Sequence, residues 1–474
     1  MRFLLALVLA AIVACAGVFI YAGHMPGPSI EITKPAKYVG VSTPVEVRVS
    51  APQGKLTKLD VVFEQNGKQT SLLSSGTSPA GAVAATTIDR EKVPDLKSGP
   101  GRIVVTAVRP VLFGLRKVQS TATHDVQVRL ERPQIAVIST KHYINLGGSE
   151  MIVYRVTPND VDSGVMVGDI RYPGYPASGV KIEGVHITDP AVRVAFFALR
   201  WDQNVNTPMF AFAQDEAGNS ARAEFDHLTF AKVFQKSTIP IDDKFIGRTI
   251  PWIYENSPEV KSTGDNLKDF LQANGKLRQL NAQKISSYSR QSAPELFWGG
   301  VAFHPFVNNA VEAKFADSRT YVYGGKEVDH QTHLGFDLAR VVNAPVVAAN
   351  RGKVLHAGPL GIYGNAIILD HGMGVQSLYG HLSSIAIKVG DMVEKEQEMG
   401  KTGQTGMAGG DHLHFTMLVS GQMVNPIEWW DAHWIQDRII RKLQEASGGA
   451  ITKDEGHITK DDGRKPRNRR RRAK

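Results

Sequence analysis

Two histidines separated by one residue, His412 and His414, have types and a spacing that could serve a metal ion. The residues that follow, Phe415 to Met417, are aromatic, branched and apolar, which is typical of a β-strand. Side chains two apart on a strand share one face, with their Cα atoms roughly 6.6 Å apart. Two imidazoles at this spacing could serve one metal centre, one as a ligand and the other beside the water that the metal activates.

His333 and Asp337 add a nitrogen donor and an oxygen donor earlier in the chain. A straight strand would hold residues four apart at about 13 Å, so the chain must bend between them, and Gly335 permits a bend. Two imidazoles and a carboxylate leave a tetrahedral Zn²⁺ one open position for water, which is the catalytic pattern. Structural zinc sites are usually closed and rich in cysteine, whereas this chain has one cysteine. The residues therefore favour a catalytic zinc site.

A single histidine is more often a core or surface group than a ligand. Here a His-x-x-x-Asp motif at His333, a Tyr-Gly-His-Leu motif at His381 and the His-x-His motif follow one another, each beside strand-like sequence. The stretch Trp298–Trp430 that contains them resembles the lysostaphin and LytM type of zinc metallopeptidase, which cuts peptide bridges or stems in bacterial peptidoglycan. The resemblance implies a β-sheet domain with an antiparallel sheet, and it implies roles for five residues: His333, Asp337 and His414 as zinc ligands, and His381 and His412 as catalytic histidines.

The same region holds further polar residues whose roles are less specific. Arg319 and Tyr321 lie in a run similar to the family's Phe-Gly-x-Arg stretch, and they are candidates either for holding substrate carbonyls and carboxylates or for ordinary structural roles. The glycines from Gly400 to Gly410 precede no Lys-Ser/Thr and helix, so they predict a loop beside the site, not a phosphate cradle. Four other histidines match no ligand position and are expected to be structural or at the surface: His304, His330, His356 and His371.

The N-terminus carries twenty residues without a charge, Phe3 to Ala22. At 1.5 Å per residue such a helix can cross the ~30 Å hydrocarbon layer. Three interpretations stay open: a retained anchor, a signal peptide that is removed, or a lipoprotein signal ending at Cys15. The length favours the anchor, and the apolar residues after Cys15 argue against a lipoprotein. All three interpretations export the rest of the chain.

The remaining sequence predicts a mainly β, multidomain chain, because 474 residues exceed one ordinary core. Short strand-like runs between Gly, Pro and Ser clusters predict two immunoglobulin-like β-sandwiches, which we interpret as spacers. Helical spacing over Asn266–Ile285, with Asp265 as its N-cap, predicts a helical connector. The expected segments are a membrane anchor at 1–25, sandwiches at 26–131 and 132–232, the connector at 233–296, the peptidase domain at 297–432, and a helix with a basic disordered tail at 433–474.

Most of the net charge of +9 comes from that tail, since Arg464–Lys474 carries eight basic residues and no acid, and the rest of the chain is close to neutral. Nucleic acid is therefore not an expected partner, and the tail predicts association with anionic polymers of the cell envelope. Together with the resemblance, these features predict a zinc metalloendopeptidase that acts on peptidoglycan. We expect a single-pass protein of the cytoplasmic membrane with a periplasmic or extracellular catalytic domain. The alternatives are a non-enzymatic regulator or scaffold of wall hydrolases, which the intact ligand set disfavours, and a zinc peptidase that cuts proteins.

Overall fold

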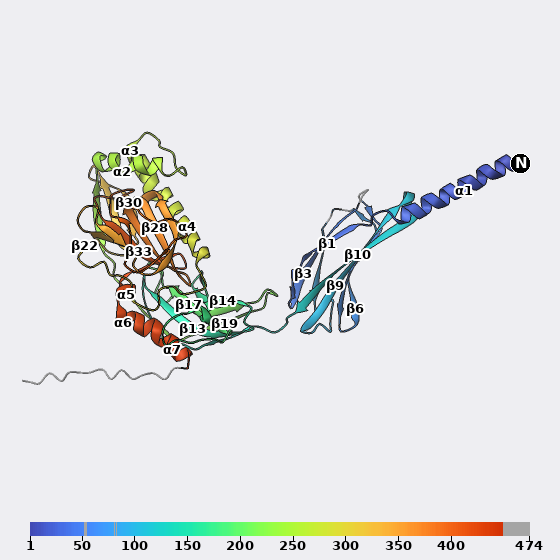
Figure 1. The fold of residues 1–474 in the computed structure, drawn as a ribbon, viewed down its shortest axis with the longest axis horizontal. Coiled ribbons are helices and arrows are strands. Elements are labelled where there is room, and N and C mark those ends of the chain that lie inside the picture. Colours follow the sequence, from blue (N-terminus) through green and yellow to red (C-terminus); the bar gives the residue numbers. More distant parts are fainter. Residues whose placement is uncertain (52–54, 80, 82, 449–474) are drawn as a thin grey trace, which may run out of the picture.

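The computed structural model describes residues 1–51, 55–79, 81 and 83–448. The chain is mainly β, and it is elongated, with helix α1 (Arg2–Gly23) at one end and two β-rich bodies after it (Figure 1). The prediction of a mainly β chain with an apolar N-terminal helix is thereby confirmed. By length and composition, Phe3–Gly23 could cross a membrane. The predictions for the basic tail, Arg464–Lys474, lie outside the described residues.

Two sheets enclose a core of their own in the first β-unit, which spans residues 29–128. Strands β3 and β5 show the alternation of buried and exposed residues that a sheet with one buried face requires. One sheet consists of β1 (Ser29–Lys34), β3 (Ser42–Ser50) and β8 (Val83–Asp89), and the other of β2 (Tyr38–Val39), β10 (Arg116–Val128), β9 (Gly99–Val111), β5 (Lys58–Gln65) and β6 (Lys68–Ser75). A short pair joins β4 (Lys55–Leu56) to β7 (Ser78–Pro79).

The second β-unit, residues 134–230, likewise contains two sheets, and here each sheet has four strands. One holds β11 (Gln134–Val137), β13 (Ser149–Thr157), β17 (Val192–Ala198) and β16 (Tyr175–Pro176), and the other β15 (Ile170–Pro173), β14 (Asp162–Val167), β18 (Met209–Gln214) and β19 (Ser220–Glu224). A separate pair joins β12 (His142–Asn145) to β20 (His227–Phe230). That both β-units are immunoglobulin-like stays a prediction.

The second β-unit shares one hydrophobic core with residues 297–432, the predicted peptidase domain, and with the helices that follow it. Phe196 in β17 packs against Trp429, with 6.0 Å between ring centroids, and the Trp429 indole donates a hydrogen bond to Ser149. Lys442 and Glu150 form a buried ion pair at 2.7 Å across the same boundary. Aromatic and ionic contacts thus fasten the second β-unit to the C-terminal part of the chain, and its interpretation as a spacer stays a prediction.

The connector begins differently from the prediction. Residues Lys236–Ile241 form strand β21, which pairs in parallel with β23 (Asp317–Tyr323), so this part is not helical. Helix α2 (Asp243–Glu255) follows, and then a continuous helical run of α3 (Asn266–Gln272), a π-helical turn (Ala273–Leu277) and α4 (Arg278–Ser287). The predicted N-cap is present, since the Asp265 carboxylate accepts a hydrogen bond from the Lys268 amide at 3.0 Å.

An eight-stranded sheet with antiparallel neighbours forms the centre of the predicted peptidase domain. Its order is β22 (Ala310–Ala313), β25 (Phe336–Ala339), β33 (Leu413–Val419), β29 (Val375–Leu382), β28 (Asn365–Gly372), β27 (Gly352–Pro359) and β31 (Met392–Val393), with β34 (Gln422–Val424) paired to β33. Strand β24 (Lys326–His333) extends the β21–β23 sheet, and β26 (Pro345–Val347), β32 (Glu398–Lys401) and β30 (Ser384–Ile385) form a third sheet. Helices α5 (Ile427–Trp430), α6 (Ala432–Ile435) and α7 (Arg441–Ala446), the last two joined by a π-helical turn, follow this domain.

Candidate metal centre

Three neighbouring strands of the large sheet bring the predicted site residues together. Asp337 in β25 lies directly opposite His414 in β33, and His414 lies opposite Gly380 in β29, one residue before His381. His333 ends β24, and the chain then passes from one sheet to another within Leu334 and Gly335. The predicted bend is therefore present. Gly335 also makes room for the cluster, since a Cβ atom there would lie 2.5 Å from Cε1 of His414.

The donor atoms of His333, Asp337 and His414 form a compact triangle. His333 Nε2 lies 2.9 Å from Asp337 Oδ1 and 3.0 Å from His414 Nδ1, and His414 Nδ1 lies 3.1 Å from Asp337 Oδ1. All three residues are buried. The Nδ1 atom of His333 faces the Lys314 carbonyl at 3.2 Å, which places its proton there and leaves Nε2 with a lone pair toward the triangle.

This triangle fits a tetrahedral metal ion. Zinc bonds of about 2.0–2.1 Å require donor atoms about 3.3 Å apart, so a small outward movement of the three observed donors would accommodate the ion. Two nitrogens and one carboxylate oxygen are a donor set that Zn²⁺ accepts. The Nε2 atom of His414, buried without a partner among the described residues, is consistent with Nδ1 being its ligating atom. The three residues could therefore hold one metal ion.

His412 and His381 lie beside this triangle and face it through the same ring atom. His412 Nδ1 donates to the Gly410 carbonyl at 2.9 Å, and His381 Nδ1 donates to the Thr405 carbonyl at 2.8 Å. Both rings therefore turn Nε2 toward the cavity, and His412 Nε2 lies 3.4 Å from Asp337 Oδ1. The His381 and His412 ring centroids are 4.8 Å apart. Two imidazoles with free Nε2 atoms at one cavity can accept and return a proton.

The backbone of His381 is strained. Its φ of 62° lies in the left-handed region, which a residue with a side chain adopts rarely. Such conformations persist where the surroundings impose them, and they gather at functional sites. For His381 the surroundings include the hydrogen bond to Thr405, whose own hydroxyl donates to the Leu382 carbonyl at 2.9 Å.

Arg319 holds the far side of the Asp337 carboxylate. Its Nη2 atom donates to Asp337 Oδ2 at 2.9 Å, and its Nε atom donates to Asp317 at 3.3 Å. Tyr321, two residues on, is buried and packs against Phe270 at 5.6 Å between centroids. Both residues line the cavity, but the Arg319 guanidinium is engaged by two carboxylates. The contacts thus support a role for Arg319 in orienting Asp337 more directly than a role in binding substrate.

The pKa values of the histidines in the cluster shift in opposite directions. Burial lowers the pKa of His381 well below its ordinary value, and the nearby His412 and His414 add to that effect. Burial also lowers the pKa of His414, to about 4. For His412 burial opposes the hydrogen bond and charge of Asp337, which prevail and raise the pKa. Among the protein groups alone, His412 thus binds a proton more readily than His381 does.

The site opens into a cavity of about 460 Å³ whose walls come partly from the connector. Ile239 of β21 and Arg278 of α4 line it beside the five predicted residues. Arg248 of α2 donates to the Gly409 carbonyl at 2.7 Å, which fixes the glycine loop that precedes His412. Sequence reasoning missed these residues. The only signal was the shift of composition before the domain, which predicted a connector but not its place at the cavity.

The four other histidines lie outside the cluster, as expected. His371 is fully buried between the Arg351 carbonyl and the Ser377 hydroxyl, both at 2.8 Å, and it is structural. His356 bonds to Tyr288, while His330 is exposed. His304 lies 3.4 Å from Glu396.

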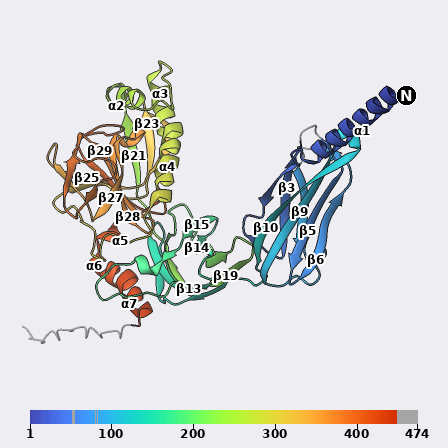
Figure 2. The same ribbon diagram turned by 45° about the vertical axis from the view of Figure 1, so that its right-hand side comes forward.

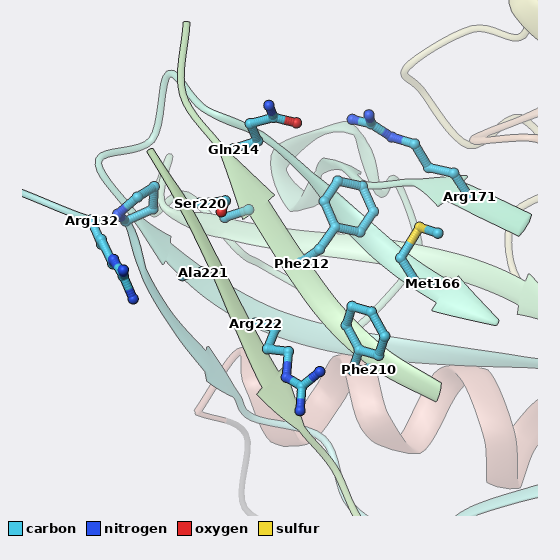
Figure 3. Close-up of a pocket in the computed structure, with 11 residues that line it drawn as sticks. Arg132, Met166, Arg171, Phe210, Phe212, Gln214, Ser220, Ala221 and Arg222 are labelled. Carbon is cyan, nitrogen blue, oxygen red and sulfur yellow. The ribbon is translucent and has the colours of Figure 1, made fainter. Parts of the chain in front are cut away.

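A larger concavity, of about 680 Å³, lies on the β14–β18–β19 face of the second β-unit (Figure 3). The Arg171 guanidinium covers the Phe212 ring at 4.4 Å, and that of Arg222 covers Phe210 at 5.4 Å. No histidine, cysteine or carboxylate is among the residues that line it. Within the described part of the chain, the group that could hold a metal ion is the cluster of His333, Asp337 and His414.

Comparison with known proteins agrees with this placement. Residues 331–426 match Peptidase family M23. Two relatives are a DD-carboxypeptidase/endopeptidase, Mpg, from Neisseria meningitidis, 34% identical over 131 residues, and the peptidoglycan DD-endopeptidase ShyA from Vibrio cholerae, 34% identical over 96 residues. The matched segments cover 27% and 20% of this chain, and 29% and 22% of those relatives. The chain thus spans less than a third of the length of these two relatives.

Two solved structures are similar over parts of the chain. A peptidase M23 structure from Pseudomonas aeruginosa has 19% identity and a TM-score of 0.36, and it covers 60% of this chain and 94% of its own. The catalytic domain of lysostaphin from Staphylococcus simulans has 30% identity and a TM-score of 0.22, and it covers 26% of this chain and 92% of its own.

Proposed function

We propose that this chain, whose C-terminal domain is a peptidase family M23 domain of the lysostaphin and LytM type, is a zinc metalloendopeptidase that hydrolyses peptide bonds in bacterial peptidoglycan. The observation that carries the proposal is the buried triangle of His333 Nε2, Asp337 Oδ1 and His414 Nδ1. Two further imidazoles at the same cavity supply proton transfer. A regulator without activity would need neither.

In the proposed reaction His333, Asp337 and His414 hold the ion. When bound, Zn²⁺ supplies Lewis acidity, which lowers the pKa of water toward ~7 and polarises the scissile carbonyl. The Nε2 atom of His412 accepts the proton of the attacking water and later gives it to the leaving amine. His381, whose neutral Nε2 also faces the cavity, shares this proton transfer or, once it has taken up a proton, donates a hydrogen bond to the developing oxyanion. The carbonyls of Gly410 and Thr405 keep both rings in the required orientation.

The substrate proposal draws on the relatives, two of which are named for DD-endopeptidase or DD-carboxypeptidase activity. The cavity is compatible with such peptides, because Arg278 at its wall offers positive charge to peptide carboxylates. The walls formed by Ile239 and the Met407–Gly410 loop would select the bond that is cut, because they line the cavity beside the metal-binding residues.

We further propose that α1 stays on the protein as a membrane anchor and that the rest of the chain lies outside the cytoplasm. The support is the apolar span Phe3–Gly23, whose side chains are exposed along nearly its whole length. A peptidoglycan substrate also requires an extracytoplasmic site. In bacteria with two membranes this corresponds to the inner membrane and the periplasm.

Digestion of purified peptidoglycan tests the proposal. The full chain in detergent should release fragments whose masses identify a cleaved peptide bond, while a His412→Ala variant should release them at least about 10²-fold more slowly. His330→Ala is the matched control, since His330 is an exposed histidine of β24 outside the cluster, and it should digest normally. Intact peptidoglycan after incubation with the zinc-loaded wild-type chain would refute the enzyme and favour the regulator.

A further inference from the structure

The turn between β9 and β10 carries two apolar side chains that the protein leaves uncovered. Phe113 is fully exposed, and the Leu115 side chain is 76% exposed. The basic residues Arg116 and Lys117 follow directly. Large apolar groups gathered at an exposed position next to basic residues suit contact with another surface better than contact with water.

The backbone of this turn is unusual. Leu112 and Phe113 have φ values of 51° and 54°, and Gly114 follows at 94°. Left-handed conformations are uncommon for bulky residues and cost free energy. A tight hairpin turn needs left-handed residues, but Gly or Asn would meet that need at lower cost, so folding does not account for an uncovered phenylalanine at position 113.

Helix α1 lies beside this turn (Figures 1 and 2). The Arg116 guanidinium covers the ring of Phe19 at 4.7 Å and donates to the Phe19 carbonyl. Arg109 in β9 donates to the Pro26 carbonyl at 2.8 Å, and Ala22 is buried. These contacts hold the end of the hairpin against the C-terminal end of the helix.

The depth of the turn follows from helix geometry. Phe19 precedes Gly23, the last residue of α1, by four residues, which is about 6 Å along the axis. If α1 spans a bilayer, its end near Gly23 lies among the headgroups, and Arg116 lies at the boundary between headgroups and acyl chains. The residues at the tip, Leu112–Leu115, then lie about 5–10 Å into the boundary between headgroups and acyl chains, which is the depth that amphipathic anchors reach.

We propose that the β9–β10 turn, Leu112–Lys117, is a second membrane contact, formed with the lipid bilayer that α1 spans. Phe113 and Leu115 enter the headgroup–acyl boundary, and Lys117 lies near lipid phosphates. The inference rests on the proposed retention of α1 as an anchor. With two contacts, the first β-unit is oriented by the membrane and does not pivot freely on α1.

Site-specific fluorescence on the full chain tests the contact. Cys15 is the chain's single cysteine, so a Cys15→Ser background allows one new cysteine to be labelled with an environment-sensitive dye. Phe113→Cys and Leu115→Cys are the test variants. Val41→Cys is the matched control, because Val41 is 55% exposed and neighbours β2, which pairs with the Val128 end of β10, opposite the turn. Each protein is reconstituted into vesicles of phosphatidylethanolamine and phosphatidylglycerol.

Labels at the two turn positions should show blue-shifted emission, quenching by acyl-chain spin labels and protection from iodide, whereas the label at position 41 should behave as in water. Labelling of the natural Cys15 reports on α1 separately. A Cys15 label buried in lipid, together with turn labels as accessible to iodide as the control, would overturn this inference alone. A Cys15 label accessible to iodide would overturn the anchor and the inference together.

Discussion

Arg319 binds one oxygen of the Asp337 carboxylate and leaves the other oxygen facing the histidine cluster. The guanidinium binds Oδ2 at 2.9 Å, while Oδ1 faces the nitrogens of His333, His412 and His414. Because Arg319 also donates to the buried Asp317, the carboxylate cannot rotate away from the cluster without breaking an ion pair. The orientation of the proposed ligand is thus set from outside the metal centre.

Replacing Arg319 by Gln should therefore weaken zinc binding. Loss of a group that orients a ligand typically lowers metal affinity 10–100-fold, and we expect a change of that order in competition with a chelator. Arg319→Lys should recover part of it, because it restores the charge but not the fork of donors. Arg351→Gln, which removes an exposed arginine paired with Glu394, is the control. Unchanged zinc affinity in Arg319→Gln would contradict this role.

Variants of the predicted ligands and of the catalytic histidines should separate by metal content. His333→Ala removes one donor of the triangle, so zinc and activity should both be lost. His412→Ala leaves all three donors, so zinc should remain while kcat falls by about 10²–10⁴-fold, the contribution of a proton-transfer group. Elemental analysis with turnover of a soluble muropeptide measures both. Full zinc occupancy in His333→Ala would refute the ligand assignment.

Gly364→Ala should impair catalysis through His381. A Cβ atom at position 364 would lie 2.4 Å from the Thr405 carbonyl oxygen, which accepts the His381 Nδ1 hydrogen bond. Displacement of this carbonyl should misorient His381 and reduce kcat about 10²-fold, with zinc retained. Gly299→Ala is matched, because the two glycines have φ values of 67° and 64° but position 299 has open space. Equal activity of the two variants would show that the clash does not matter.

The pH dependence of stability should change when Glu428 becomes Gln. Burial raises the pKa of Glu428 to about 7, despite hydrogen bonds from Asn145 and Ser149. Between the unfolded value of 4.5 and about 7 the folded protein binds more protons, so this carboxyl lowers the free energy of unfolding as pH rises. Relative to the wild type, Glu428→Gln should gain about 3 kcal/mol from pH 4.5 to pH 7.5.

Urea denaturation at the two pH values measures this difference. Buried His142 and His371, whose pKa values fall to about 4, give the opposite slope in both proteins, so only the difference between variant and wild type isolates Glu428. A difference that does not change with pH would contradict the raised pKa.

The sequence predicted the features that depend on residues close together in the chain. The Asp265 cap and the helix after it appear because a carboxylate satisfies nearby amides. The gathering of the five site residues was inferred from motifs beside strand-like sequence. Strand β21 was not predicted, because its six residues include Pro240 and pair with β23 about eighty residues later. The place of Ile239 at the cavity depends on that pairing, and the Arg319–Asp337 ion pair joins β23 to β25, so no local signal revealed either.

The contact between the second β-unit and the C-terminal helices also escaped prediction, for the same reason of distance along the chain. Glu428 accepts hydrogen bonds from Asn145 and Ser149, more than 275 residues earlier. In the sequence alone, Glu428 would be assigned to the exposed face of a helix, because the distant residues that bury it and bond to it are not apparent.

The shared core also sets the order in which the protein can mature. Ile435, Ile439 and Leu443 belong to the core that begins at Ile144, and a ribosome delivers them after all five site residues. A nascent chain that ends before Ala432 would thus hold the whole metal cluster on a body with an uncovered face. Completion of this core therefore waits for the segment that carries Ile435, Ile439 and Leu443, although every residue of the proposed metal centre has already been synthesised.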